Sequence, residues 1–536
     1  MLNDNNTLFR VRDSSGKPAM SEANEVQAWH ATSLPAYSPT PKRKRRGHAQ
    51  EIIKHTILHA LLKQVNTFKV KSKFLQHILH CFPLYAIVLG GVIRLMYTSK
   101  YPLLLGDGWE YHFEAVNILK YGTFSRSEVP PIQPTYTRVP GYPLFLAGVY
   151  FLFGIQYKYA LIVQVLLSVI TAYWIFRLIL DSTIPKAKQI ANLFLIVHVV
   201  YFRADIFVNH ILSETLTTFI TVGIAYYLLH QKNLYKASIL LGYGMIVRVD
   251  MVILPVFILL FLWIYRKKYL FSYRKIAVSC FLLIIPISLW IMRNAITFGI
   301  FMPVSAPFPI QSVSKSGFAL WCKTWITNEN EMQRGHWSIM FCEYQDFGKA
   351  DIPQYAFWSD KEKQDILAIQ HQINETHTYT PAMDSIFRQY AYLHIQQKPF
   401  KVLVLNPIRT GWNLWVHTGS EYFWFLQGIS LHDAFQNPFI VSHFFKILLS
   451  GMYVLLLLFA FLGLVFFFAY KLWKYRLFIL LIALWLHRTS FYMFLFLPEH
   501  RYMTSALWIV WVFSVTGIVY MYDLLSKKRK ATLATT

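Results

Sequence analysis

The chain has 536 residues, of which 55% are hydrophobic, 17% aromatic and 15% charged. Soluble domains carry about 25% charged residues, so this composition excludes an ordinary soluble domain. The formal net charge of +25 comes mostly from lysine and arginine at the N-terminus and in short segments between apolar stretches. Because inward-facing loops of membrane proteins are rich in these residues, we interpret the surplus as a topology signal and expect no nucleic-acid partner.

Residues 1–80 form a polar, basic segment with no signal-peptide pattern at its start. We expect residues 1–50 to be disordered and residues 51–80 to form an amphipathic surface helix. The basic run 42–46 is expected to rest against anionic headgroups of the membrane. The segment is therefore assigned to the cytoplasm.

Ten apolar stretches follow, and we expect each to form a membrane-spanning helix, because about 20 apolar residues cross the hydrocarbon core. In chain order they are 82–98, 158–180, 188–204, 211–229, 236–248, 251–265, 276–293, 443–470, 477–490 and 503–523. A further stretch, 142–153, is stopped by Gly154 and is too short to span alone. It is interpreted as re-entrant or interfacial.

This interpretation of 142–153 decides the topology of the whole chain. With it, every lysine-bearing short loop and both termini lie in the cytoplasm; counting 142–153 as a span would place all those loops outside. The fold class is therefore an all-α polytopic membrane protein with a mixed extracytoplasmic domain before the last helices. The segments are 1–80 (cytoplasmic), 81–295 (transmembrane catalytic module with outer loop 99–141), 296–440 (extracytoplasmic domain) and 441–536 (C-terminal helices and basic tail).

Arginine, rather than lysine, is enriched at the outer ends of the expected spans. A planar guanidinium binds phosphate through two parallel hydrogen bonds, so a phosphate site at the outer membrane surface would use such residues. The alternatives are arginines that extend to lipid headgroups and, for Arg203, a simple pair with Asp205. The arginines in question are Arg94, Arg138, Arg203, Arg248, Arg293, Arg488 and Arg501.

Three carboxylates stand out on the same face: Asp107, Asp205 and Glu214. A carboxylate at membrane depth is costly and is a candidate functional residue. Asp107 and Glu214 together are a candidate site for a divalent cation, Mg²⁺ or Mn²⁺, and either is a candidate general base toward an acceptor hydroxyl. Helix capping is the alternative, notably for Asp107. Cys322 and Cys342 share the outer segment, where a disulfide and two separate thiols are both consistent with the sequence.

The order of several short motifs resembles that of GT-C membrane glycosyltransferases. The resemblance is strongest to the group of dolichyl-phosphate-mannose protein mannosyltransferases and aminoarabinose transferases, family 39 in the broad sense. It covers about 82–300, and more loosely 390–525. The motifs are Asp107 with Tyr111, Ala115 and Gly122; the run 138–145 (Arg-Val-Pro-Gly-Tyr-Pro-Leu-Phe); Leu152-Phe153-Gly154; Ser213-Glu214-Thr215-Leu216; Arg293-Asn294 with Phe298-Gly299; and His500-Arg501-Tyr502.

The resemblance implies inverting transfer of a sugar from a polyprenyl-phosphate donor to a glycolipid, glycan or protein acceptor on the non-cytoplasmic face. It implies that Asp107 is the catalytic carboxylate and that Glu214 supports the site or a metal. Donor-phosphate ligands would be Arg138, Arg501 and Arg248, and further substrate contacts would come from Tyr111, Tyr142, Asp205 and Tyr502. The form of the motifs indicates a bacterial inner membrane with a periplasmic active site.

Two departures from the family pattern leave the acceptor open. Asp107 is followed by Gly108, where the protein mannosyltransferases have an Asp-Glu pair, and the run 138–144 replaces the Lys-Pro-Pro-Leu stretch of the aminoarabinose enzymes. The competing functions are a transporter or flippase of a lipid-linked or anionic substrate and a glycan polymerase or ligase. Charges at the outer rim favour group transfer, whereas charges at the bilayer midplane favour transport.

Overall fold

The computed structural model describes residues 73–100, 102–104, 106–269, 271–304, 315–340, 352–495 and 498–535. The chain divides into two units, Met1–His77 and Ile78–Thr536, and the first lies almost entirely outside the described residues. The expectations for the basic N-terminal run and for a disulfide at Cys342 therefore fall outside the described part of the chain.

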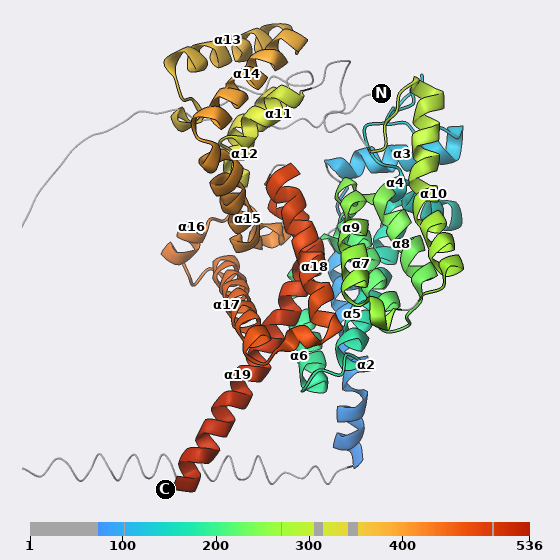
Figure 1. Ribbon diagram of the computed structural model, residues 1–536, viewed down its shortest axis with the longest axis vertical. Coiled ribbons are helices and arrows are strands. Elements are labelled where there is room, and N and C mark those ends of the chain that lie inside the picture. The colour runs from blue at the N-terminus through green and yellow to red at the C-terminus, as the bar shows by residue number, and fades with distance from the viewer. Residues whose placement is uncertain are drawn as a thin grey trace, which may run out of the picture. The chain divides into compact units, whose positions relative to one another are not determined.

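All ten expected spans coincide with helices (Figure 1). They are α2 (Lys73–Lys100), α5 (Tyr157–Leu180), α6 (Ala187–Val200), α7 (Glu214–Leu229), α8 (Leu234–Val247), α9 (Leu254–Ile264), α10 (Tyr273–Phe298), α17 (Val441–Ala469), α18 (Arg476–Ser490) and α19 (Leu507–Thr535). In the described ranges the only β contact is an isolated bridge between Leu103 and His210. The chain is thus a helical protein, as its composition predicts.

By length and composition, 6 helices among the described residues are able to cross a membrane. A seventh span is added if α6 and the 3-10 helix η1 (Phe202–Asn209), which meet at 43°, are counted together. Helices α7, α8 and α9 are apolar but shorter, with 16, 14 and 11 residues. The chain is therefore an integral membrane protein, and the expected total of about ten spans stays a prediction for these shorter helices.

The short elements between the long helices position the polar residues. Helix α3 (Asp107–Tyr121) and helix α4 (Gly141–Phe153) pack together after α2, and α4, with 13 residues, begins one residue before the short apolar stretch expected at 142–153. Helix α8 ends at Val247, and Arg248 has extended backbone before η2 (Val249–Ile253) and α9. Two separate helices, α8 and α9, therefore flank Arg248 in place of one long helix. This agrees with the two spans expected at 236–248 and 251–265.

The C-terminal helices α17 and α19 pack along one another at two glycines. A Cβ atom at Gly463 would lie 2.0 Å from the carbonyl oxygen of Phe513, and one at Gly517 would lie 2.1 Å from that of Phe459. Only glycine at these two positions lets the backbones of α17 and α19 approach so closely. Such close approach of backbones is a common way for helices to pack together in lipid. The 3-10 helix η10 (His500–Ala506) leads directly into α19.

The described residues of 315–397 form a helical module with its own apolar core, named the outer module after its expected location. Its helices are α11 (Ser316–Lys323), α12 (Glu329–Met340), α13 (Asp360–Thr376) and α14 (Pro381–Gln397). Phe318, Trp321, Ile366 and Phe387 are fully buried in this core. Helices α15 (Asn406–Val416) and α16 (Leu431–Gln436) follow, and α15 contributes Leu414 and Trp415 to the main core instead. The described residues of 296–440 contain no strand, so this part is helical where a mixed domain was expected. Polar residues interrupt the apolar periodicity of these helices, so the helices are difficult to recognise in the sequence.

Candidate active site

Arginines and carboxylates alternate in one continuous network of ion pairs. It joins α3, the loop that follows it, the start of α7, the break between α8 and α9, the end of α18, and η10. In order of contact its members are Arg126, Glu110, Arg138, Asp107, Arg501, Glu214, Arg248, Asp250 and Arg488, with Glu499 as a further partner of Arg501. The sequence places these residues up to several hundred positions apart, and the fold brings them together.

Asp107 is the first residue of α3 and lies between two arginines. Its Oδ1 is 2.7 Å from Nη2 of Arg138, and its Oδ2 is 2.9 Å from Nη2 of Arg501. Burial raises the pKa of Asp107, but the two guanidinium groups outweigh burial and hold this pKa well below its ordinary value. The N-terminus of α3 has no side-chain cap, so the carboxylate binds arginine instead of capping the helix.

Glu110 is a member of the network that the sequence analysis missed. Its Oε2 is 2.8 Å from Nε of Arg138, and its Oε1 pairs with Nη2 of Arg126. Residues three apart on a helix share a face, so Asp107 and Glu110 both reach Arg138. The signal in the sequence was the three-residue spacing of Asp107 and Glu110, which places both carboxylates on one face of a helix.

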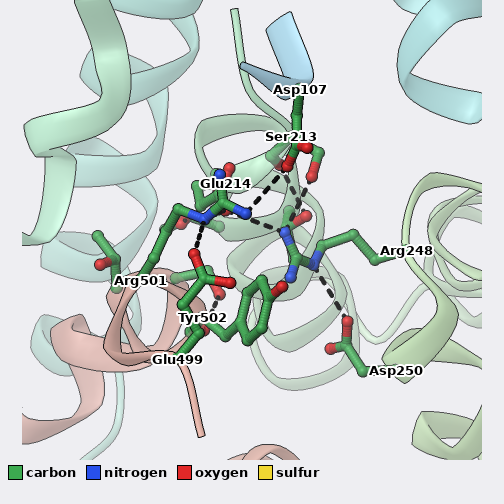
Figure 2. A network of polar contacts seen from close by, with 12 residues as sticks. Asp107, Ser213, Glu214, Arg248, Asp250, Glu499, Arg501 and Tyr502 are labelled. Carbon is green, nitrogen blue, oxygen red and sulfur yellow. Dashed lines mark hydrogen bonds and ion pairs between the residues drawn. The ribbon is translucent and has the colours of Figure 1, made fainter. Parts of the chain in front are cut away.

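Arg248 and Arg501 converge on Glu214 from two sides, as Figure 2 shows. Nη1 of Arg248 is 3.2 Å from Oε1 of Glu214, and Nε of Arg501 is 3.7 Å from the same oxygen. Both guanidinium groups lie over the ring of Tyr502, at 5.1 and 5.4 Å from its centroid. Glu499 lies 2.7 Å from Nε of Arg501. This group is the most densely charged part of the network.

Asp250 pairs with both Arg248 and Arg488 and so links Arg248 to the end of α18. Oδ1 of Asp250 is 3.1 Å from Nε of Arg248, and its Oδ2 pairs with Nη1 of Arg488. The side chains of Arg488 and Asp250 are only 4% and 1% exposed. The hydroxyl of Tyr492 lies 2.9 Å from Nη2 of Arg248. Arg488 is thus a buried support for the network, and Arg248, with a side chain 11% exposed, is the more accessible of these two arginines.

The two tyrosines expected to contact substrate lie side by side. The ring of Tyr111 meets that of Tyr142 edge to face at 4.9 Å, and Cζ of Arg138 is 5.7 Å from the Tyr111 centroid. Burial raises the pKa of Tyr111 to about 12, so its phenol keeps its proton at neutral pH. Tyr142 is fully buried, and its hydroxyl donates to Gln164 at 2.9 Å. Tyr111 borders the network, and Tyr142 supports it.

Asp205 lies in a different cluster, apart from this network. Its Oδ2 is 2.9 Å from Nη2 of Arg94 and accepts from the hydroxyl of Ser168 at 3.1 Å, and Nε2 of His198 is 3.3 Å away. Asp205 therefore pairs with Arg94, and the suggested pair with Arg203 is wrong. The structure does not bring Asp205 together with the other expected substrate contacts.

The geometry does not suit a divalent cation at Asp107 and Glu214. Both oxygens of Asp107 already accept from arginine, and Arg248 and Arg501 flank Glu214. Guanidinium groups at these distances repel a cation and attract an anion. No group of three or more metal-ligating side chains exists in the part of the chain that the structure describes. A phosphate or another anion fits this site better than Mg²⁺ or Mn²⁺.

Glu114 is the second carboxyl of α3 that the sequence analysis missed. It is fully buried, and neither of its carboxyl oxygens has a hydrogen-bond partner. Burial raises its pKa to about 8 against the opposing effect of Arg138, so Glu114 is mostly neutral at pH 7. Asp107 and Glu114 therefore have opposite protonation states on one helix.

Comparisons with known proteins found similarity to solved structures but to no protein family or curated sequence. No family model and no curated protein sequence match it. Solved structures that match include two of ArnT from Cupriavidus metallidurans. The apo structure is 11% identical, with 80% of this chain and 76% of the ArnT chain covered and a TM-score of 0.35. The structure bound to undecaprenyl phosphate is 10% identical, with 81% and 76% covered and a TM-score of 0.33. Values of this size assign neither a family nor a function.

Proposed function

We propose that this protein is a GT-C-type membrane glycosyltransferase that moves a sugar from a polyprenyl-phosphate donor to an acceptor on the non-cytoplasmic face. The observation that carries the proposal is the convergence of Arg138, Arg248 and Arg501 around Asp107 and Glu214. The motif order that resembles family 39 supports it independently.

The arginines provide the site for the donor phosphate. Each guanidinium presents a planar set of N–H donors that matches two phosphate oxygens. Arg138 and Arg501 now donate to Asp107, so a phosphate that binds them competes with that carboxylate. Donor binding would therefore release Asp107 from its ion pairs and raise its basicity at the point where a base is needed.

These positions support the following reaction. The acceptor hydroxyl oxygen attacks the anomeric carbon of the sugar, and the bond from that carbon to the phosphate oxygen breaks. The polyprenyl phosphate leaves with the electron pair of this bond, and the arginines stabilise its charge. The carboxylate of Asp107 accepts the proton of the acceptor hydroxyl. Glu214 and Glu110 hold the arginines in place, and no step requires a metal or another cofactor.

The location of the chain follows the same proposal. The lysine-bearing loops would face the cytoplasm together with both termini. The arginine network would then lie at the outer side of a bacterial inner membrane. The partners would be membrane lipid, the polyprenyl-phosphate-linked sugar and a glycolipid, glycan or protein acceptor.

Binding of undecaprenyl phosphate to the full-length protein in detergent tests the donor site. Arg138→Gln should weaken binding about tenfold or more, because charge-assisted hydrogen bonds contribute about 1.5–3 kcal/mol. Arg177→Gln is the matched control. Arg177 pairs with Asp181 at a partly exposed position and is not a member of the network. Equal affinity of wild type and Arg138→Gln would remove Arg138 from the donor site.

A further inference from the structure

A second cluster of positive charge lies beside the network, and its central residue is Arg203. This side chain is 2% exposed and has no ion pair with a carboxylate among the described residues. One of its N–H groups donates to the hydroxyl of Thr504 at 3.0 Å. Its Nε is buried without a hydrogen-bond acceptor. A buried guanidinium in this state is costly unless an anion joins it.

Other buried arginines of the chain differ from Arg203 in this respect. Arg94 pairs with Asp205, and Arg488 pairs with Asp250. The guanidinium of Arg203 instead lies over the ring of Tyr422, 4.7 Å from its centroid. The missing carboxylate is therefore a specific property of this position and not a general feature of arginine in this protein.

Lys446 adds a second buried cation to the same cluster. It is 5% exposed, on α17, and it forms neither a hydrogen bond nor an ion pair within the described residues. Burial lowers the pKa of His417, and the charges of Arg203 and Lys446 lower it further against the effect of Glu421. Both cations therefore lie within electrostatic range of the His417 ring.

The segment 417–420 covers Arg203 closely. A Cβ atom at Gly419 would lie 2.0 Å from Nη2 of Arg203, and Gly419 has a φ of +61°. Glycine is required there both for the left-handed backbone and for the contact with the guanidinium. Two nearby carboxylates form no ion pair with Arg203 among the described residues: Glu421 lies 3.3 Å from Nδ1 of His417, and Glu329 accepts from the backbone N–H of His500 at 3.2 Å. Nδ1 of His417 itself accepts from the backbone N–H of Gly419 at 3.2 Å.

Helix η10 connects this cluster to the network. His500 stacks on His417 with ring centroids 3.8 Å apart, and Thr504 accepts from Arg203. The intervening residue Arg501 pairs with Asp107, and Ser505 accepts from Arg488. The 3-10 helix η10 thus contributes His500 and Thr504 to the Arg203 cluster, and Arg501 and Ser505 to the ion-pair network.

We propose that Arg203 and Lys446, together with the ring of His417, bind an anionic group of the acceptor, a phosphate or a carboxylate. The proposal rests on the proposed function, because it places acceptor recognition beside the donor site. An incoming anion would supply the missing partner of Arg203 and accept from its free Nε. The donor phosphate would remain with Arg138, Arg248 and Arg501.

Inorganic phosphate is the probe for this site. Full-length protein in nanodiscs of phosphatidylcholine is melted over a range of phosphate concentrations. Wild type should show two protective components, with Arg138→Met losing one, Arg203→Met losing the other and the double variant losing both. Arg203→Met should also melt higher than wild type without phosphate, because an uncompensated buried charge is removed. Arg409→Met is the matched control at an exposed position.

The outcomes separate this inference from the proposed function. If Arg203→Met melts lower and keeps the full phosphate response, the guanidinium is structural and the inference is overturned. If Arg203→Met alone removes the whole response, this site stands and the donor assignment of Arg138 fails. If Arg138→Met alone removes it, the donor site stands and this inference fails.

A second measurement assigns the anion to the acceptor. In transfer reactions with a membrane extract, Arg203→Met should raise the amount of extract for half-maximal rate about tenfold and leave the KM for the donor unchanged. A structural lipid headgroup is the other source of the same chemistry. In that case nanodiscs with phosphatidylglycerol would abolish the Arg203-dependent phosphate response while acceptor dependence stays as in wild type, which would overturn the acceptor assignment.

Discussion

Two carboxyl groups on α3 have opposite electrostatic environments. Arg138 and Arg501 hold Asp107 ionised, so its stabilising contribution is present above its ordinary pKa and is lost only in strong acid. Glu114 has no such partner, and burial keeps it protonated. Pairs of titratable groups with pKa values shifted apart mark sites where proton transfer takes place. The contrast gives the site a pH dependence that separate variants can measure.

Glu114→Gln should remove a pH dependence of stability. The pKa of Glu114 rises from 4.5 to about 8 on folding, so the folded protein retains a proton that the unfolded chain releases in this window. The stabilising contribution is complete below the unfolded value and is lost as pH rises through the folded value. Glutamine stays neutral, so the variant should melt progressively higher than wild type from pH 5 to pH 9. Parallel melting curves would show that Glu114 is ionised in the folded protein.

Glu110→Gln should lower the transfer rate without unfolding the protein. Glu110 holds Arg138 at 2.8 Å and also pairs with Arg126, so its loss leaves Arg138 without one of its two carboxylate partners. We expect a loss of about tenfold in kcat/KM for the donor, with rescue by Glu110→Asp. Glu128→Gln, at an exposed position of the loop that follows α3, is the control. An unchanged kcat/KM would limit Glu110 to a structural role.

At the residue scale the sequence allowed part of the site to be predicted. Asp107, Arg138 and Arg501 belong to motifs with a family resemblance, and the structure brings them together. Glu110 and Glu114 were missed because their environments depend on how the loop after α3 packs on that helix: Glu110 pairs with Arg126 and Arg138, whereas the carboxyl of Glu114 is buried without a hydrogen bond. The pairing of Asp205 depends on which helix packs against η1, and no single sequence contains that information.

Buried ion pairs join helices at the element scale. Arg94 on α2 binds Asp205 on η1, and Ser168 on α5 donates to the same oxygen. Asp205→Asn should destabilise the protein by about 3–5 kcal/mol, because it leaves Arg94 buried and unpaired. Asp181→Asn, which alters the half-exposed pair with Arg177, should cost less than about 1 kcal/mol. Denaturation in mixed micelles provides both values, and similar values would contradict this role.

The outer module depends on one buried carboxylate. Asp384 on α14 accepts from the backbone N–H groups of Gly317 and Phe318 at the start of α11, and from the hydroxyl of Tyr379 at 2.9 Å. Asp384→Ala should loosen α11 by about 1–3 kcal/mol, because buried N–H groups lose their acceptors. Limited proteolysis should then cut within 315–340 faster than in wild type. An unchanged cleavage pattern would show that water replaces the carboxylate.

The helices themselves were well predicted because apolar length is a strong local signal. All ten expected spans coincide with helices, and the break at Arg248 lies between the two spans expected at 236–248 and 251–265. The outer module was harder to predict, since its helices are short and its core is made from residues distant in sequence. Trp321 illustrates this, because it is fully buried and donates to Glu362 at 2.8 Å.

At the scale of the whole molecule, topology decides whether the network faces the donor. Reporter fusions at both termini should be cytoplasmic, because lysines cluster in the same set of loops. A cysteine introduced at exposed Glu128 should react with a membrane-impermeant reagent in intact cells. Labelling only after lysis would place the arginine network on the cytoplasmic side and contradict the proposed donor orientation.

The most direct test of the account is sugar transfer by purified protein. Wild type and Asp107→Asn, with equal melting behaviour, are given radiolabelled polyprenyl-phosphate sugars and a membrane extract. We expect label on an acceptor with wild type, and a rate about 10²- to 10⁴-fold lower with Asp107→Asn, the range for loss of a general base. Equal rates would remove Asp107 from the chemistry. No transfer from any donor by folded wild-type protein would contradict a glycosyltransferase and favour transport.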